Sequence, residues 1–530
     1  MPAADDDITP PDPGDRERRA AEAESAATAN HELRDAALAG VRWVAGARIA
    51  SEIVAFAAAI ALARLLAPAE FGRAAVALAI VPLAAILTFE GCASSLVQRP
   101  EIGREHRDSA AFLSISTGIV LTILTAAISP LLAPIFGDRI AALVLLVSPA
   151  FLLASPGCVP RALLWRELQF RRLSMIEVAG LLAGSGTSVG LALAGLKAEA
   201  LIGGGLAMTG ITSLLLCLSA PIGTPRLHSR EAKDIAGFGI PAALAGLVHV
   251  GFANVDYVIM AARLSATQAG LYWRAFQLGV TYQEKVSGIL LRLAYPVYSR
   301  APAPEDVRRM HERATRLHAT IVLPFLGFAA ATAPTLVPWL FGPAWNGAVL
   351  PTQILAVAGM ISAVLTGYPQ VMLALNKPRE LLRFNLAIFV LYGAVIVVAA
   401  SGGLIAACIA AVGAHLLIFI GVYHFMLGRH LGVPMRRSLT DVAPGLCGTA
   451  IVAACGFPLR ALLEANDVPS TAVLVVVGAC SAIVYVSTIR IFFTTAWDDL
   501  MLLASRILPA RLRPAAARLA TPAAATTGGP

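Results

Sequence analysis

The chain has 530 residues, of which 57% are hydrophobic and 14% charged, and it carries a formal net charge of +8. This composition excludes a soluble globular protein, because too few polar residues are present to cover a water-exposed surface. The positive charge does not indicate a nucleic-acid partner, since the basic residues lie in short loops between apolar runs. The sequence therefore predicts a membrane protein.

Residues 1–35 are rich in Asp, Pro, Arg and Ala and lack the apolar core of a cleaved signal, so we expect a disordered tail. About fourteen apolar segments follow, each long enough to cross a hydrocarbon core of about 30 Å. Residues 496–530 are expected to form a second tail. The sequence predicts an all-α fold with membrane helices at 41–66, 73–97, 109–134, 139–157, 174–195, 200–221, 235–262, 270–298, 317–341, 349–375, 382–400, 403–427, 439–460 and 470–493.

Basic residues orient these segments. The loops that follow even-numbered segments are rich in Arg and Lys, whereas loops 342–348 and 401–402 on the other side carry almost none. Basic loops stay in the cytoplasm, so both termini are predicted to be cytoplasmic, which requires an even number of crossings. The orienting residues are Arg99, Arg104, Arg107, Arg161, Arg166, Arg171, Arg172, Arg226, Arg230, Lys233, Arg300, Arg308, Arg309, Arg313, Lys377, Arg379, Arg429, Arg436 and Arg437.

The end of the first segment is repeated at the end of the seventh. ALARLLAPAEFGRAA (61–75) and MAARLSATQAGLYWRAF (260–276) share Arg-Leu, a turn of small residues, and a Gly expected just before the next helix. Six helices separate the copies, so both run in the same direction through the membrane. This predicts a lobe at 36–222, a second lobe at 223–428, and two further helices within 429–495.

Ionisable side chains inside apolar helices are costly unless they face a polar cavity. Here they concentrate on the first, second, seventh and eighth segments, which marks these four segments as candidates for function. In the eighth, the polar side chains fall near one stripe at helical spacing. The candidates on these four segments are Arg48, Glu52, Glu90, His249, Asn254, Asp256, Arg274, Gln277, Thr281, Glu284, Lys285 and Arg292.

Further motifs occur in a specific order: SSLVQRPEI (94–102), VPRALLWRELQFRRLSMIE (159–177), NVDYVIMAARLSATQAGLYWRAFQL (254–278), YPVYSR (295–300) and NKPRELLRFNL (376–386). With these motifs and ARLLAPAEFG, the chain resembles the polysaccharide exporters, or Wzx-type flippases, of the multidrug, oligosaccharidyl-lipid and polysaccharide superfamily. It is most similar to their colanic-acid and succinoglycan branch. The resemblance covers roughly residues 40–495.

The resemblance implies two six-helix lobes in a V-shaped arrangement within the bacterial inner membrane. It implies a transporter rather than an enzyme, one that flips undecaprenyl-diphosphate-linked oligosaccharide units for exopolysaccharide or lipopolysaccharide biosynthesis. The polyprenyl tail of that substrate would remain in the membrane lipid between the lobes. A polymerase and export machinery of the same pathway would be its partners.

A diphosphate needs cationic donors to cross a region of low dielectric. Arg offers a bidentate fork and Lys a point charge, so Arg48, Arg274 and Lys285 are predicted to bind the diphosphate, with Arg292 as a further cation. Asn254, Gln277 and Thr281 could bind sugar hydroxyls. Two alternatives stay open: the charges neutralise one another, or Arg274 and Arg292 extend to the membrane interfaces.

Glu90, His249 and Asp256 are candidates for ion coupling, because a desolvated carboxylate can load and release a proton. His249 could instead be a packing residue. No cofactor or metal is expected, since the sequence has neither a phosphate loop nor a metal-binding pattern of Cys and His.

Two other functions remain possible. A cation-coupled multidrug exporter of the same superfamily is disfavoured by the Arg and Lys stripe on the eighth segment. A membrane-embedded polysaccharide polymerase or ligase is disfavoured because every loop is short.

Overall fold

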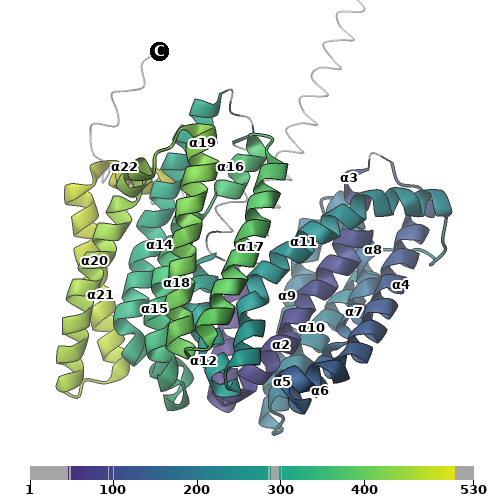
Figure 1. Cartoon of the computed structure of the whole chain (residues 1–530), viewed down its shortest axis with the longest axis horizontal. Helices are drawn as coiled ribbons and strands as arrows, with labels where there is room; N and C mark the ends of the chain where they lie inside the picture. The colour runs from purple at the N-terminus through teal and green to yellow at the C-terminus, as the bar shows by residue number, and fades with distance from the viewer. Residues whose placement is uncertain are drawn as a thin grey trace, which may run out of the picture.

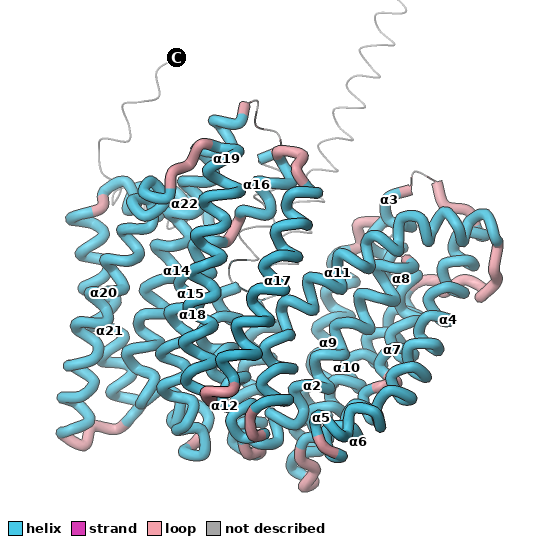
Figure 2. The backbone as a smooth tube through the Cα atoms, viewed as in Figure 1, coloured by secondary structure: helices cyan, strands magenta, loops and turns pink. Residues whose placement is uncertain are grey.

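The computed structural model describes residues 46, 49–93, 95–99, 101–284, 287, 298–299, 301 and 303–507. Within these ranges, the side chains at 90, 98, 242, 245, 249, 252, 253 and 503–507 are not described. Every regular element in the described part is helical, and Figure 2 shows these helices joined by short loops.

The first half of the chain begins with helical residues 49–65. Pro68 then starts the second helix at its first position, where its missing N–H costs nothing. The elements of this half are α2 (Pro68–Ala85), η1 (Ile86–Glu90), α3 (Ser95–Gln98), α4 (Arg104–Ile128), η2 (Ser129–Leu132), α5 (Ala133–Phe136), α6 (Asp138–Val147), α7 (Ala150–Ala154), η3 (Ser155–Gly157), α8 (Cys158–Arg166), α9 (Phe170–Leu193) and α10 (Ala198–Ser219).

The second half begins with α11 (Ser229–Arg263), and its next helix is capped by Ser265, whose hydroxyl accepts a hydrogen bond from the Gln268 N–H at 3.3 Å. Its remaining elements are α12 (Ala266–Phe276), η4 (Gln277–Thr281), α14 (Pro304–Phe341), η5 (Pro343–Ala348), α15 (Val349–Leu365), α16 (Tyr368–Ala374), α17 (Pro378–Ala400), α18 (Leu404–Gly421), η6 (Val422–Leu427), α19 (Gly428–Leu431), α20 (Met435–Ala465), α21 (Ser470–Phe492) and α22 (Thr494–Ile507).

Eleven helical stretches of the described residues are long and apolar enough to cross a membrane. They coincide with eleven of the fourteen predicted segments. The first, seventh and eighth predicted segments fall on helix 49–65, on α11, and on α12 with η4, and they are not among the eleven. The all-helical membrane fold is thus confirmed, while the count of fourteen stays a prediction.

Several boundaries differ from the predicted ones. The ninth segment, expected at 317–341, begins at Pro304 because a charged amphipathic stretch extends the helix beyond its apolar part. The tenth, expected at 349–375, is broken at Gly367, whose φ of 105° no other residue type adopts readily. The tail expected from 496 begins with a helix, α22, whose Trp497 is buried in a small apolar cluster.

The helices form two groups in Figure 1, α2–α10 and α14–α21, which lie side by side at the lower end of the view and diverge at the upper end. The long helix α11 runs from the first group toward α12 and packs on both. Its Asp234 pairs with Arg99 of the first half at 3.4 Å, whereas its Asp256 bonds Tyr392 of the second half. The second lobe predicted at 223–428 therefore begins with a helix that contacts both groups.

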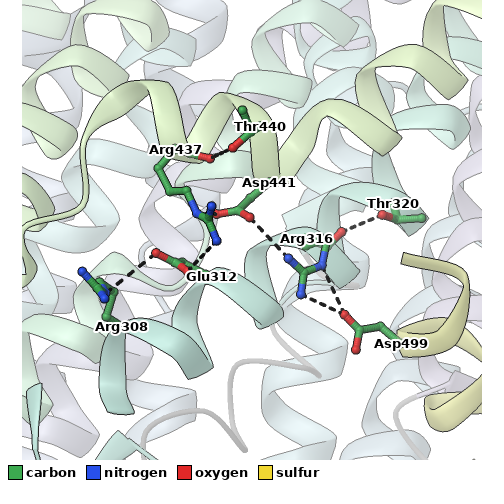
Figure 3. Close-up of polar contacts among 8 residues, drawn as sticks. All are labelled: Arg308, Glu312, Arg316, Thr320, Arg437, Thr440, Asp441 and Asp499. Atoms are coloured by element: carbon green, nitrogen blue, oxygen red, sulfur yellow. Dashed lines mark hydrogen bonds and ion pairs between the residues drawn. The ribbon is translucent and has the colours of Figure 1, made fainter. Parts of the chain in front are cut away.

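An ion-pair network joins α14, α20 and α22 (Figure 3). The guanidinium of Arg316 contacts Asp441 of α20 at 3.3 Å and Asp499 of α22 at 3.1 Å. Arg313 contacts Asp499 at 2.7 Å, and Arg437 contacts Asp441 at 3.9 Å. These contacts fasten α20 and α22 to α14.

We expect Arg316→Ala to lower the free energy of unfolding by about 2 kcal/mol, because it removes one partner from two largely buried carboxylates that each keep another arginine. Arg309→Ala is the matched control: its ion pair with Asp306 lies at the surface, where Arg309 is 74% exposed, and should be worth less than about 0.5 kcal/mol. Thermal unfolding in detergent, followed by tryptophan fluorescence, measures both changes. Equal melting temperatures for the two variants would contradict this role of the network.

Candidate functional site at the contact of the two halves

The first turns of α2 and α12, which are the two copies of the sequence repeat, contact each other. Pro68 and Ala266 are the first residues of these helices, and Gly72 and Gly270 are the fifth. A Cβ added to Gly72 would overlap the carbonyl oxygen of Ala266, and one added to Gly270 would overlap that of Pro68. The contact is therefore reciprocal, as expected for two related copies that meet across an axis of approximate symmetry. We call it the α2–α12 contact.

Each glycine lies inside its helix, which corrects the expectation that it precedes the helix. The cap residues Ala67 and Ser265 are extended, so the turn ends before each glycine is reached. The glycines serve close helix approach, a common use of small residues between membrane helices.

Two polar contacts reinforce the same end of the molecule. Arg64 donates from Nε to the Leu340 carbonyl at 2.9 Å and from Nη2 to the Trp339 carbonyl at 2.6 Å. It thereby caps the carboxyl end of α14, where unpaired carbonyls favour a cation. In the opposite direction, the indole N–H of Trp345 donates to the Ala63 carbonyl at 2.8 Å. The two halves thus exchange hydrogen bonds beside the α2–α12 contact.

Arg274 lies next to this contact and is fully buried, with 0% exposure. Its guanidinium carbon lies 4.7 to 5.2 Å from four ring centroids, close enough for cation–π attraction. We call these rings the arginine cage: Phe71 from the first half, and Trp273, Phe341 and Trp345 from the second.

Arg274 has no carboxylate partner among the described residues. Its Nη1 donates to Gln277 Oε1 at 3.4 Å and its Nη2 to the Ala59 carbonyl at 3.5 Å, while its Nε has no partner in the described part of the chain. Neutralisation by a neighbouring acid, one of the two open alternatives, is thus not seen for Arg274 among the described residues. In this conformation the cage covers Arg274, and its binding of a substrate stays a prediction.

The polar residues predicted to bind sugars occupy different surroundings. Gln277 is half-buried and bonds Arg274, as its position three residues later predicts. Thr281 is half-buried at the end of η4. Asn254, on α11, uses one amide hydrogen on the Val250 carbonyl of its own helix at 2.9 Å. Among the described members of the predicted substrate-binding group, the structure thus brings together Arg274 and Gln277.

Asp256 lies inside the second half, with 1% exposure. It accepts hydrogen bonds from the hydroxyls of Tyr272 at 2.9 Å and Tyr392 at 3.4 Å, and from the Tyr257 N–H at 2.9 Å. The Tyr392 ring in turn meets the His415 ring edge-on, with centroids 5.9 Å apart. The two tyrosines were not predicted as partners of Asp256, because they lie on other helices, and nothing in the motif at 254–278, which contains Tyr272, indicates that the two side chains meet.

The other predicted residues lie partly or wholly outside the description. Arg48, Lys285 and Arg292 fall outside the described residues. Glu90 and His249 lie in η1 and α11, but their side chains are not described.

Potential metal ligands come together once in the described part of the chain. One oxygen or nitrogen from each of Glu105, His228 and Glu231 lies within 4.8 Å of the others. Both glutamates lie in the first turns of helices, where the helix dipole favours carboxylates whether or not a metal is bound. Helix electrostatics therefore account for this group.

Comparison with known proteins shows which family and which relatives the chain resembles. The family described as "Polysaccharide biosynthesis protein" matches residues 61–350. The lipopolysaccharide biosynthesis protein WzxC of Escherichia coli (strain K12) is 27% identical over 364 residues, covering 67% of this chain and 73% of WzxC. The succinoglycan biosynthesis transport protein ExoT of Rhizobium meliloti (strain 1021) is 27% identical, covering 53% of this chain and 55% of ExoT.

A solved structure shares the fold. The lipid II flippase MurJ, in an inward closed conformation, superposes with a TM-score of 0.62 at 10% sequence identity, covering 84% of this chain and 98% of MurJ. The predicted resemblance is confirmed, because the family match spans more than half of the residues. This multi-pass membrane protein belongs to the polysaccharide biosynthesis protein family.

Proposed function

We propose that the chain flips undecaprenyl-diphosphate-linked oligosaccharide units across the bacterial inner membrane for exopolysaccharide or lipopolysaccharide biosynthesis. The family and the names of WzxC and ExoT support a role in polysaccharide export. The observation that carries the proposal is the α2–α12 contact. Two repeat-related helices that meet through close glycine packing and aromatic contacts, with no ion pair between them among the described residues, can separate and meet again, as transport by alternating access requires.

We further propose that the α2–α12 contact faces the periplasm. The basic loops lie toward the opposite ends of these helices, and such loops remain in the cytoplasm. Both termini would then be cytoplasmic, and the two six-helix lobes would be open toward the cytoplasm and closed toward the periplasm in this conformation. A lipid-linked substrate would enter from the cytoplasmic leaflet.

The arginine cage suggests how the cation and the substrate meet. Opening of the α2–α12 contact would remove Phe71 and the Ala59 carbonyl, which are the parts of the surroundings of Arg274 contributed by the first half. A desolvated cation–π contact is worth about 2 kcal/mol. A charge-assisted hydrogen bond to phosphate is worth about as much, roughly 1.5–3 kcal/mol. Replacing the cation–π contact by a hydrogen bond to phosphate therefore changes the free energy little, so the two lobes can open and close repeatedly.

The remaining predicted residues complete this proposal. Arg48, Lys285 and Arg292 would accompany the diphosphate, and Asn254, Gln277 and Thr281 would bind sugar hydroxyls. Asp256, together with Glu90 and His249, would couple transport to an ion. The polymerase of the same pathway would take up the exported units. The chain would act as a transporter and not as an enzyme.

Deletion of the gene tests the function directly. We expect cells without it to accumulate lipid-linked oligosaccharide in the cytoplasmic leaflet and to lose the exported polymer, with both restored by a plasmid copy. Leaflet-specific labelling of the sugars, together with polymer quantification, measures the outcome. Normal polymer export, or altered drug susceptibility as the sole defect, would refute the proposal, the latter in favour of a drug exporter.

Arg274→Ala should reduce export by about tenfold or more, since about 1.4 kcal/mol of lost substrate binding already has this effect. The double variant with Lys285→Ala should abolish export while the protein remains folded in the membrane. Arg263→Ala is the matched control, because it removes an exposed cation near the same end and should leave export unchanged. Full export by the double variant would remove both residues from the substrate site.

Gly72→Ala and Gly270→Ala should each reduce export by about tenfold, because the added methyl overlaps a carbonyl of the facing helix and overpacking costs about 1–3 kcal/mol. Gly186→Ala is the control, since its methyl would enter open space. Export is compared at equal membrane abundance of each variant. If the three variants export equally, the α2–α12 contact has no part in transport.

A further inference from the structure

A row of buried polar side chains runs along α14, away from the arginine cage. His311, Thr315 and His318 follow one another at about one helical turn and are only 3%, 5% and 4% exposed. They meet residues from the eighth predicted segment, 270–298. We call the whole set the polar seam: Gln283, Ser287, Tyr298, His311, Thr315 and His318.

One end of the polar seam is well paired. His318 Nδ1 lies 3.0 Å from the Ala363 carbonyl, which can only accept, so Nδ1 carries the hydrogen. In the neutral ring, Nε2 must then accept, and the Ser287 hydroxyl lies 2.5 Å from it. The single Ser287 hydrogen is donated to this ring nitrogen, so the Gln283 carbonyl at 2.7 Å and Gln283 Oε1 at 3.1 Å lie beside the hydroxyl as alternative acceptors.

The other end is unpaired among the described residues. Both ring nitrogens of His311, the hydroxyls of Thr315 and Tyr298, and the amide nitrogen of Gln283 have no hydrogen-bond partner there. The rings of Tyr298 and His311 nevertheless meet edge-on, with centroids 6.4 Å apart. Buried polar groups almost always have a partner, in the protein or in bound water.

The unpaired hydroxyl of Thr315 differs from those of other threonines on α14. Thr320 and Thr332, on the same helix, donate to the carbonyl four residues earlier, each at 2.7 Å. That is the usual solution for a threonine inside an apolar helix. The Thr315 hydroxyl makes no such bond and is free to bond within the seam.

We propose that the polar seam is a binding site for buried water. A buried water molecule makes about three hydrogen bonds, so about two molecules would satisfy the five unpartnered atoms. A metal ion fits poorly, because the two histidines are seven residues apart, roughly 10 Å along the helix, and the seam contains no carboxylate. Water also suits the mixture of donors and acceptors that the seam presents.

The bound water would allow α14 to move relative to the segment that carries Gln283. Because water can exchange hydrogen-bond partners, α14 and the segment that carries Gln283 can shift against each other without leaving buried groups unpaired. This role rests on the proposed function, since the same segment leads back to Arg274. The presence of water does not rest on the proposed function, and it can be tested without a transport assay.

Radiolytic hydroxyl labelling of the full-length protein, read by mass spectrometry, tests the site, because radicals formed from bound water modify the residues beside it. We expect Tyr298 and His311 to be modified about tenfold faster than their 3% exposure would allow. Tyr272 is the matched control: it is fully buried, and its hydroxyl is paired with Asp256. Modification of Tyr298 and His311 as slow as that of Tyr272 would overturn the proposal.

A second comparison uses variants of equal shape. Thr315→Val removes a hydroxyl that we assign to water, and should lower the melting temperature and slow the labelling of His311 severalfold. Thr332→Val removes a hydroxyl bonded only within its own helix and should leave the labelling unchanged. A Thr315→Val protein that is as stable as the parent, or more so, and that is labelled equally would mean that Thr315 binds no water and would overturn the proposed site. Either result leaves the proposed export function untouched.

Discussion

Gly72 and Gly270 lie so close to the facing carbonyl oxygens of Ala266 and Pro68 that neither position has room for a methyl group. This steric constraint sets how near the two halves of the chain come to each other. Close approach brings Phe71 over Arg274, lets Arg64 reach the end of α14, and lets Trp345 reach back to the first half. The aromatic and polar contacts at this end therefore depend on two residues that have no side chain.

The burial of Arg274 follows from the same constraint. A guanidinium is normally buried only with a carboxylate, because an unpaired charge is costly in a medium of low dielectric. Here aromatic faces, one side-chain amide and one backbone carbonyl replace the carboxylate. A fixed acid would hold the arginine permanently and compete with a phosphate. A cage that loses one wall when the halves separate leaves the cation available, which suits the proposed role.

The sequence predicted the larger features because they depend on patterns that survive without three-dimensional context. Apolar length locates membrane helices, and the repeat at 61–75 and 260–276 marks the two segments that meet. It could not predict the cage around Arg274, because Phe71, Phe341 and Trp345 are far apart in sequence and aromatic residues are ordinary in membrane helices. A glycine after a turn also looks the same whether it ends the turn or lies inside the next helix.

Polar groups in this protein are paired in two ways, according to where they lie. At the α14–α20–α22 junction, direct ion pairs such as Arg316 with Asp441 and Asp499 fasten α20 and α22 to α14. Across the α2–α12 contact the partners are rings and carbonyls, and the ion pair of Glu70 with Arg73 lies within α2 itself. Along the polar seam the partners are neutral side chains, a carbonyl and, as we propose, water. Ion pairs of fixed geometry resist displacement, whereas these softer partners can be exchanged. Along α14 the two kinds of contact face different neighbours: ion pairs hold α20 and α22 to this helix, whereas the polar seam faces the segment that carries Gln283 and Ser287.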